Sequence, residues 1–265
     1  MNRRSPVLIF ALACALLLLG CRDETTVTPP HAKADAHWSY SGDTGPDRWG
    51  VIDDDYERCA SGAEQSPVDL SPALAVRDAN DVVFDYRASD LSIVNNGHTV
   101  QVVYEPGSTI SVEAATYDLL QFHLHAQSEH TLDGTRFPLE LHLVHMDSDG
   151  NLAVVGVLFE EGAPNAALEP VFSHMPSSET EEPVKVDGVT VDAAALLPES
   201  HEVFEYPGSL TTPPCSERVR WFVMARPVQA SAGQIAAFTT LYSANFRPLQ
   251  PLNDRELRLS EEFNR

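Results

Sequence analysis

Three histidines, His123, His125 and His142, have a spacing that could place their imidazoles around one metal ion. His123 and His125 point to the same face of a strand, whereas on a helix they would lie on nearly opposite sides. Three histidines without a fourth protein ligand are typical of catalytic zinc, because structural zinc sites are closed by four protein ligands. The sequence therefore predicts a zinc site with one open position. Two nearby histidines are assigned structural roles, since His130 lies in a connection and His145 on an apolar face.

Two β-strands must position these histidines. In the first, Gln121 and the two histidines alternate with an apolar face made of Leu120, Phe122 and Leu124. In the second, residues 139–144, Glu140 and His142 alternate with leucines. Successive side chains of a strand point to opposite faces, so each stretch predicts one polar and one apolar face. An Asp-Gly turn pair at 133–134 in the connection allows the second strand to lie beside the first.

Most other periodic segments of the chain also predict strands. An Asn-Asn-Gly sequence at 95–97 predicts a tight turn between two of them. A capping box from Ser231 to Gln234 predicts a helix, and a shorter helix is predicted to begin at Asn165. The acidic segment 177–192 is interpreted as an irregular surface excursion. The predicted strands are 81–86, 91–94, 99–104, 152–159 and 219–224.

The N-terminal sequence predicts that the protein is exported. Two arginines precede an apolar run, 7–19, which is too short to span a bilayer but suits a signal peptide. The run ends in Leu-Leu-Gly-Cys, which is similar to a bacterial lipobox and would make Cys21 the acylated first residue of a periplasmic, membrane-anchored lipoprotein. Residues 1–20 are therefore predicted to be a signal peptide, 21–36 a flexible tether, and 37–265 one catalytic domain.

The cysteines support export. Of four cysteines, Cys14 leaves with the signal and Cys21 would carry lipid. Cys59 and Cys215 remain as an even pair in an oxidising compartment, which predicts a disulfide.

The charge of the chain is strongly acidic, with 39 acidic against 17 basic residues. Removing Arg3 and Arg4 with the signal changes the net charge from −22 to −24 (−22 − 2). Such a charge argues against nucleic acid as a partner and against electrostatic binding to anionic lipid. Any membrane attachment should therefore come through the lipid anchor.

Beside the histidine motifs, the segment YPGSLTTPP (206–214) is interpreted by composition alone as a rigid loop. Together with QFHLH (121–125), SEHTLDG (128–134) and ELHLVH (140–145), it resembles the α-class carbonic anhydrases. The resemblance implies a mainly β (α+β) single domain, built on a large twisted, mostly antiparallel sheet with short peripheral helices. It continues through HWSYSG (37–42), QSPVDL (65–70), VNNGH (94–98), NLAVVGVLF (151–159) and FRPLQPL (246–252).

The resemblance implies reversible hydration of carbon dioxide to bicarbonate by zinc-bound hydroxide. The family's zinc ligands fall on His123, His125 and His142. The acceptors for their second ring nitrogens fall on Gln121, Glu140 and the backbone carbonyl of Asn245, which would fix each tautomer.

The resemblance also assigns the remaining parts of the site. Thr211 and Glu129 would form a gate in which the Thr211 hydroxyl donates to Glu129 and accepts from the hydroxide, with Thr212 adding polar contacts. His98 would shuttle the proton, because an imidazole titrates near neutral pH. An apolar wall for carbon dioxide would comprise Val144, Val154, Leu210, Val219 and Trp221. Ordered relay waters would contact Tyr40, Asn96 and Gln101, while Trp38, Trp49 and Arg247 are assigned to structure.

Two alternatives stay open at this point. His123, His125 and Glu129 also satisfy the cupin spacing H-x-H-x-x-x-E, although Tyr117 and Arg136 replace the glycines expected there. A non-catalytic binding protein on the carbonic anhydrase scaffold is disfavoured, because all three histidines and both gate residues are present. Sulfonamide binding and a homodimer are further expectations from the resemblance.

Overall fold

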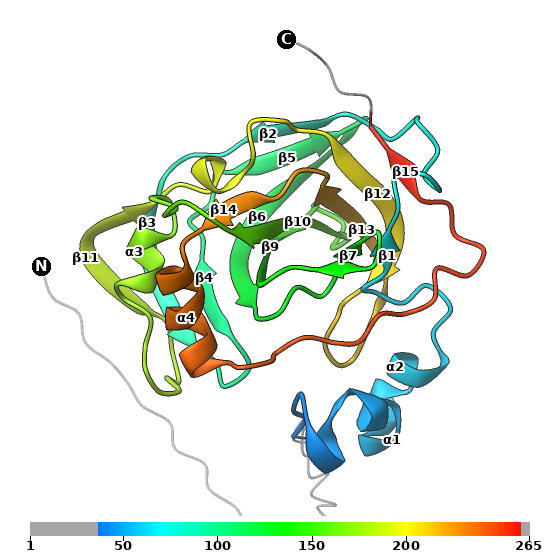
Figure 1. The fold of residues 1–265 in the computed structure, drawn as a ribbon, viewed down its shortest axis with the longest axis horizontal. Helices are drawn as coiled ribbons and strands as arrows, with labels where there is room; N and C mark the ends of the chain where they lie inside the picture. Colours follow the sequence, from blue (N-terminus) through cyan, green and yellow to red (C-terminus); the bar gives the residue numbers. More distant parts are fainter. Residues whose placement is uncertain (1–36, 261–265) are drawn as a thin grey trace, which may run out of the picture. The chain divides into compact units, whose positions relative to one another are not determined.

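A twelve-stranded sheet dominates the computed structural model, which describes residues 37–260 (Figure 1). Its main path runs β11-β3-β4-β6-β9-β10-β13-β12-β15, while β5 pairs with β6 and β2, and β14 pairs with β10. Within this sheet, β13 and β14 are the strands that pair in parallel, both with β10, so the mostly antiparallel sheet predicted from the sequence is confirmed. The strands are β2 Val82–Asp85, β3 Ser89–Asn95, β4 Val100–Val103, β5 Thr109–Val112, β6 Ala115–His125, β9 Leu139–Met146, β10 Leu152–Glu161, β11 Val184–Val191, β12 Val203–Ser209, β13 Glu217–Met224, β14 Val228–Ala230 and β15 Arg258–Leu259.

A small second sheet consists of β1 (Asp69–Leu70), β7 (Thr131–Leu132) and β8 (Thr135–Arg136). Asp133 and Gly134 connect β7 to β8 with φ of 47° and 75°. Positive φ at both central residues is what a two-residue type I′ hairpin requires, so the predicted turn is confirmed. This hairpin lies in the connection between β6 and β9, the two strands that carry the histidines.

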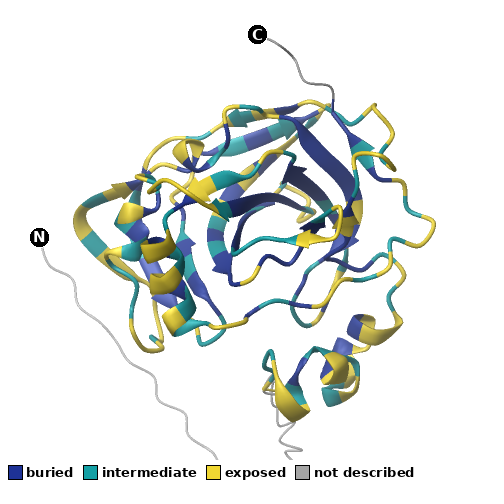
Figure 2. Cartoon of the chain, in the orientation of Figure 1, coloured by how far each residue is buried: buried dark blue, intermediate teal, exposed yellow. Residues whose placement is uncertain are grey.

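The core lies on both faces of the central strands (Figure 2). In β10 every residue from Ala153 to Phe159 is buried, because β9, β13 and β14 flank it and side chains cover both faces. A nearly continuous apolar sequence is what such a strand needs. The central strands are thereby held rigidly, which fixes the side chains that they carry.

Strand β6 contains an irregularity that changes which side chains face the core. The ladder between β6 and β9 shifts register between Leu119 and Gln121. The extra residue of a β-bulge reverses the phase of the alternation, so Leu119 and Phe122 are both buried whereas Leu120 is 38% exposed. The prediction that Leu120 belongs to the apolar face is therefore wrong. Phe122 and Leu124 face the core as expected.

Two segments differ from their predictions. The segment interpreted as an irregular excursion, 177–192, contains the edge strand β11, which pairs with β3 through β-branched residues that favour a strand. The YPGS residues at 206–209, interpreted as loop, form the end of β12. They have ladder partners in β13, and only the residues from Leu210 onward leave the sheet.

Helices are short and peripheral. The capping box of α4 is confirmed, with the Ser231 hydroxyl accepting from the N–H of Gln234 and the Gln234 side chain accepting from the N–H of Ser231. The helix predicted to begin at Asn165 begins instead at Glu169, after turns. Within residues 37–260, no helix is long and apolar enough to cross a bilayer. The α-helices are α1 Trp49–Ile52, α2 Arg58–Ser61, α3 Glu169–Phe172 and α4 Ala232–Leu241, and the 3-10 helices are η1 Gly42–Thr44, η2 Pro46–Arg48, η3 Asp54–Tyr56 and η4 Ala194–Leu196.

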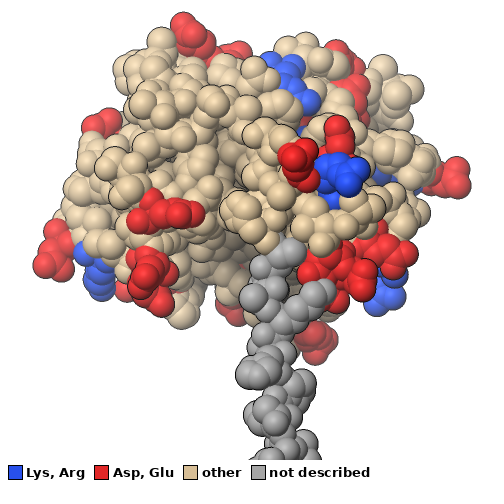
Figure 3. Space-filling view, turned by 90° about the horizontal axis from the view of Figure 1, so that it is seen from below, with Lys and Arg blue, Asp and Glu red and all other residues tan. Residues whose placement is uncertain are grey.

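The surface shown in Figure 3 carries acidic side chains over most of its rim, with basic side chains set beside acidic ones. Among the ion pairs of the described residues, Lys185 lies 2.7 Å from Asp90, measured from Nζ to Oδ2. The predicted signal peptide (1–20), Cys21 and the tether (21–36) lie outside the described residues.

Candidate active site

His123, His125 and His142 meet on one face of the β6–β9 pair. His123 lies directly opposite His142 in the antiparallel ladder, and His125 follows two residues later on the same face. The ring centroids are 4.5 to 5.3 Å apart. One ring nitrogen of each histidine lies within 4.8 Å of the other two, which is compatible with binding one ion.

Each imidazole has an oxygen acceptor for its second nitrogen. His123 Nδ1 lies 2.9 Å from Gln121 Oε1, and His125 Nδ1 lies 2.7 Å from the backbone oxygen of Asn245. Because a carbonyl oxygen can only accept, the ring nitrogen facing it is the donor, and the other nitrogen keeps its lone pair.

His142 uses the opposite ring nitrogen from the other two. Its Nε2 lies 2.9 Å from Glu140 Oε1, so Nδ1 is left with a lone pair. Three lone pairs thus converge, from Nε2 of His123, Nε2 of His125 and Nδ1 of His142. His125 Nε2 is buried without a hydrogen-bond partner among the described residues. A buried, unpaired acceptor is costly unless it ligates something, so the donor set fits a zinc ion.

Burial favours the neutral imidazoles that a metal requires. Burial, reinforced by His125 and His142, holds the pKa of His123 well below its usual value, and burial also lowers the pKa of His125. For Glu140, burial alone would raise the pKa, but His130 and His142 outweigh it and hold the pKa well below its usual value. Glu140 is therefore an ionised acceptor for the two imidazoles that contact it.

Glu129 lies next to the histidine cluster and is fully buried. Its Oε1 accepts the backbone N–H of Arg247 at 2.7 Å. Its Oε2 lies 3.7 Å from His125 Nε2 and 3.9 Å from His142 Nδ1, and has no hydrogen-bond partner within residues 37–260. The hydrogen bond predicted from the Thr211 hydroxyl to Glu129 is not formed in the structure, so this oxygen remains free to accept a hydroxyl proton. Thr211 is itself buried.

The loop after β12, residues 210–216, holds both gate-region threonines and one half of the disulfide. Cys215 is bonded to Cys59, so the predicted disulfide is confirmed. Within the loop, Cys215 N–H donates to the carbonyl of Thr212 at 2.8 Å. The disulfide therefore fixes the loop close to Thr211 and Thr212.

The five residues predicted to form an apolar wall belong to one hydrophobic cluster. Val154, Val219 and Trp221 are almost fully buried, and Val144 and Leu210 pack against them. The Trp221 ring lies 4.8 Å from the His142 ring, centroid to centroid, so the cluster reaches one of the three candidate ligands.

His98 is stacked on Trp38, with ring centroids 3.7 Å apart and planes 7° from parallel. Its pKa is lowered by partial burial and by His37, with Glu179 acting in the opposite direction. Trp38 thus contacts a predicted functional residue, beyond the structural role assigned from the sequence.

The three residues expected to order relay waters lie in different settings. Tyr40 packs edge-on against Trp38 and Trp49, and Gln101 lies opposite His123 in the β4–β6 ladder. The side-chain oxygen of Asn96 accepts two backbone N–H groups of its own turn, at 2.9 and 3.0 Å, which leaves its amide nitrogen for solvent.

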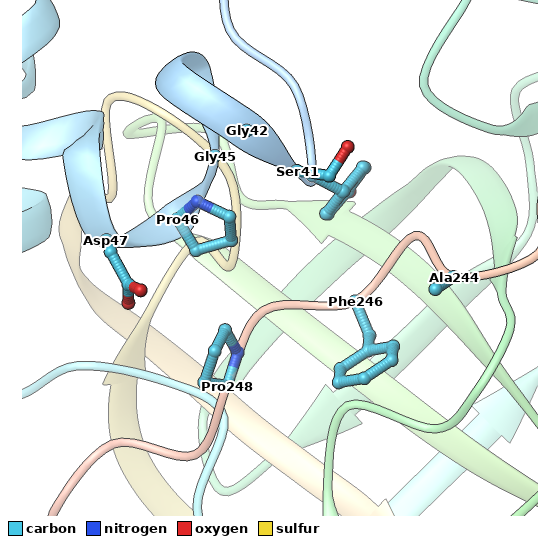
Figure 4. Close-up of a pocket in the computed structure, with 9 residues that line it drawn as sticks. Ser41, Gly42, Gly45, Pro46, Asp47, Ala244, Phe246 and Pro248 are labelled. Carbon is cyan, nitrogen blue, oxygen red and sulfur yellow. The ribbon is translucent and has the colours of Figure 1, made fainter.

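A cavity of ≈ 260 Å³ borders Tyr40 but is not lined by the three histidines (Figure 4). It lies between the segment around η1 and η2 and the segment after α4, whose Phe246 and Pro248 side chains form part of its lining. The same second segment supplies the Asn245 carbonyl to His125, so it connects the cavity wall to the candidate site.

Sequence reasoning missed two connections to the site. His130, assigned to structure, contacts Glu140 and the Tyr206 hydroxyl. Arg247, also assigned to structure, binds the carbonyls of Cys59 and Ser66 through its guanidinium while its N–H contacts Glu129. Neither contact has a periodic signal, because each joins a loop to a distant part of the chain.

Comparisons with known proteins agree with this geometry. The sequence profile described as eukaryotic-type carbonic anhydrase matches residues 44–261. A carbonic anhydrase of Nostoc sp. is 42% identical over 243 residues, which cover 90% of this chain and 91% of that protein. The α-carbonic anhydrase of Thermovibrio ammonificans, solved with the inhibitor sulfanilamide, is 42% identical with a TM-score of 0.80, over 85% of this chain and 99% of that one. Dioscorin, solved with ascorbate, is 31% identical with a TM-score of 0.79, over 86% of this chain and 100% of that one.

Proposed function

The chain belongs to the family of eukaryotic-type (alpha) carbonic anhydrases, and from this membership we propose that it hydrates carbon dioxide reversibly to bicarbonate and a proton at the three-histidine cluster. The observation that carries the proposal is the convergence of three imidazole lone pairs, one of them on a buried nitrogen without a partner. The unpaired nitrogen alone does not mark a ligand, because His145 Nδ1 is also buried without a partner in the described part of the chain. The distinguishing feature is that three imidazoles meet within ligand distance of one another, a grouping that does not include His145. The fold and family exclude the cupin alternative.

Zinc is the metal that this donor set fits. His123, His125 and His142 would hold it, and Gln121, Glu140 and Asn245 would fix the three rings. When bound, zinc supplies a Lewis acid that generates a nucleophile from water at neutral pH.

The surrounding residues bind and orient the reactants. Glu129, an acceptor through its free Oε2, would hold the Thr211 hydroxyl proton, so that the Thr211 oxygen must accept from the nucleophile and thereby orient it. The cluster around Trp221 would bind carbon dioxide, which carries no net charge and gains from an apolar surface. Thr212 would add polar contacts to bicarbonate.

Replacing His98 by Ala should slow carbon dioxide hydration in weak buffer, because the proton released at the site would lose its relay to solvent. We expect a fall of roughly 10-fold or more. Stopped-flow assays at low buffer concentration measure the loss, and added imidazole should restore the rate. Equal rates for His98→Ala and the wild-type protein would remove the role of His98.

Stopped-flow hydration of carbon dioxide by the mature protein tests the proposed function directly. We expect turnover that sulfanilamide inhibits, because a sulfonamide nitrogen can occupy the open position of a catalytic zinc site. The relative from Thermovibrio ammonificans was solved with this inhibitor. A protein that binds one zinc ion but neither hydrates carbon dioxide nor binds sulfanilamide would instead be a binding protein on this scaffold.

We also propose that the enzyme is exported and works in the periplasm. The disulfide supports an oxidising compartment. Residues 1–20 would be removed, Cys21 acylated, and residues 21–36 would tether the catalytic domain, 37–265, to the membrane. Mass spectrometry showing an unacylated N-terminus on the mature protein would contradict the lipid anchor.

A further inference from the structure

We propose that His130 is a positioning residue for the metal site, which fixes the carboxylate of Glu140 and through it the ligand His142. This inference rests on the proposed zinc site. His130 ligates nothing in that site and lies in the connection between β6 and β9, yet its side chain is completely buried against the residues that hold a ligand. Its effect should therefore appear in metal retention, beyond any contribution to folding.

The Glu140 carboxylate collects four hydrogen bonds, and His130 supplies two of them. Oε1 accepts from His130 Nδ1 at 2.7 Å and from His142 Nε2 at 2.9 Å. Oε2 accepts the backbone N–H groups of Glu129 and His130, at 2.7 and 2.8 Å. The carboxylate is thus held from both sides, and its orientation toward His142 depends on the residue at position 130.

A further contact holds the other ring nitrogen of His130. The Tyr206 hydroxyl oxygen lies 2.6 Å from His130 Nε2, and this hydroxyl donates its proton to Ser66 Oγ at 2.9 Å. Because a carboxylate can only accept, Nδ1 of His130 is the donor to Glu140. Both ring nitrogens of His130 therefore have a partner, which fixes the orientation of the ring beside Glu140.

The same three residues, His130, Glu140 and His142, are close enough to hold a second metal ion. The hydrogen bonds argue against that use. Both imidazoles already contact Glu140 Oε1 at hydrogen-bond distance, so a metal there would have to displace both protons and would compete for His142. Positioning of one site, rather than a second site, accounts for the geometry.

Two substitutions distinguish the hydrogen bond made by Nδ1 of His130 from the one made by Nε2. In His130→Asn the amide nitrogen occupies roughly the place of Nδ1 and can still donate to Glu140. In His130→Gln the amide reaches toward Tyr206 instead, and Glu140 loses its donor. We expect His130→Gln to release zinc roughly 3- to 10-fold faster than the wild-type protein, less than the 10- to 100-fold typical when a group bonded directly to a ligand is removed. His130→Asn should release zinc at a rate much closer to that of the wild-type protein.

The measurement is the rate of zinc transfer from the loaded mature protein to a coloured chelator, with urea unfolding of each zinc-free variant alongside. His145 provides the matched control, because it is an equally buried histidine bonded to a hydroxyl, at 2.9 Å from that of Tyr86, without contact to Glu140. His145→Asn and His145→Gln should change stability and leave zinc release unchanged.

Equal acceleration in both His130 variants, in proportion to lost stability, would overturn the inference, and so would wild-type release from His130→Gln. If neither variant folds, Tyr206→Phe removes the single hydroxyl that contacts His130 Nε2 and should accelerate release by a smaller factor; an unchanged rate would overturn the inference. A wild-type protein that binds no zinc would instead overturn the proposed function, so the two failures are distinguishable.

Discussion

His142→Ala should abolish stable zinc binding and lower the rate of carbon dioxide hydration by about 10³-fold or more. A metal contributes several kcal/mol to catalysis of this kind, and about 4 kcal/mol corresponds to roughly 10³ in rate. The substitution also removes a hydrogen bond to Glu140 and leaves a buried carboxylate with one partner fewer. Zinc content by atomic absorption and stopped-flow hydration measure the two losses.

The control for this experiment lies on the same strand. His145→Ala removes a histidine that faces the opposite side of β9, packs on Tyr86, and contacts none of the three predicted ligands in any described interaction. It should lower stability while zinc content stays at one per chain. Full activity in His142→Ala with zinc still bound would show that His142 is not a ligand.

Removing the disulfide should produce the largest loss of stability. Replacing both Cys59 and Cys215 by Ser should lower the free energy of unfolding by about 2–4 kcal/mol, since the bridge closes a long loop and chain entropy alone gives roughly 5 kcal/mol. The sequence separation is 156 residues. Urea unfolding at equilibrium, with and without reductant, measures the change.

Activity should fall along with stability. The bridge joins the 210–216 loop, which carries Thr211, to the segment whose Cys59 carbonyl accepts from the Arg247 guanidinium at 2.8 Å. Arg247 N–H in turn holds Glu129. Both predicted gate residues thus depend on the bridge, so reductant should lower turnover in the wild-type protein and leave the double serine variant unaffected. A reductant effect of equal size on both proteins would contradict this.

The central strands could be predicted because their alternation directly reflects burial. The histidines of β6 and β9 alternate with core residues, and an alternation with a period of two residues indicates a β-strand. Strand β11 could not be predicted in this way, because it lies at a sheet edge and is exposed along most of its length. It also begins after an acidic segment. Edge strands lack the apolar face on which the prediction depends. The bulge at Leu120 had one signal, the adjacent leucines 119 and 120, which interrupt the alternation of the strand. The predicted strand begins at this pair, whereas β6 begins at Ala115, so the prediction does not include the residues before the break.

The three candidate ligands could be identified from spacing alone, whereas the groups that support them depend on long-range folding. His130 and Glu140 are ten residues apart along a connection whose path no local pattern determines. Arg247 reaches Cys59 across 188 residues. Family resemblance supplied Gln121, Glu140 and Asn245 as acceptors, but it left His130 and Arg247 as structural residues. Contacts of this kind require the three-dimensional arrangement.

Because of the bulge at Leu120, strand β6 depends more on its number of residues than on the polarity of the residue at position 120. Residues before it and residues after it pack on the same core although their alternations are out of step by one. A polar side chain at position 120 would project into water at little cost. Deleting the residue would instead turn either Leu119 outward or the paired imidazoles inward, so an insertion or deletion at this point would do more harm than most substitutions.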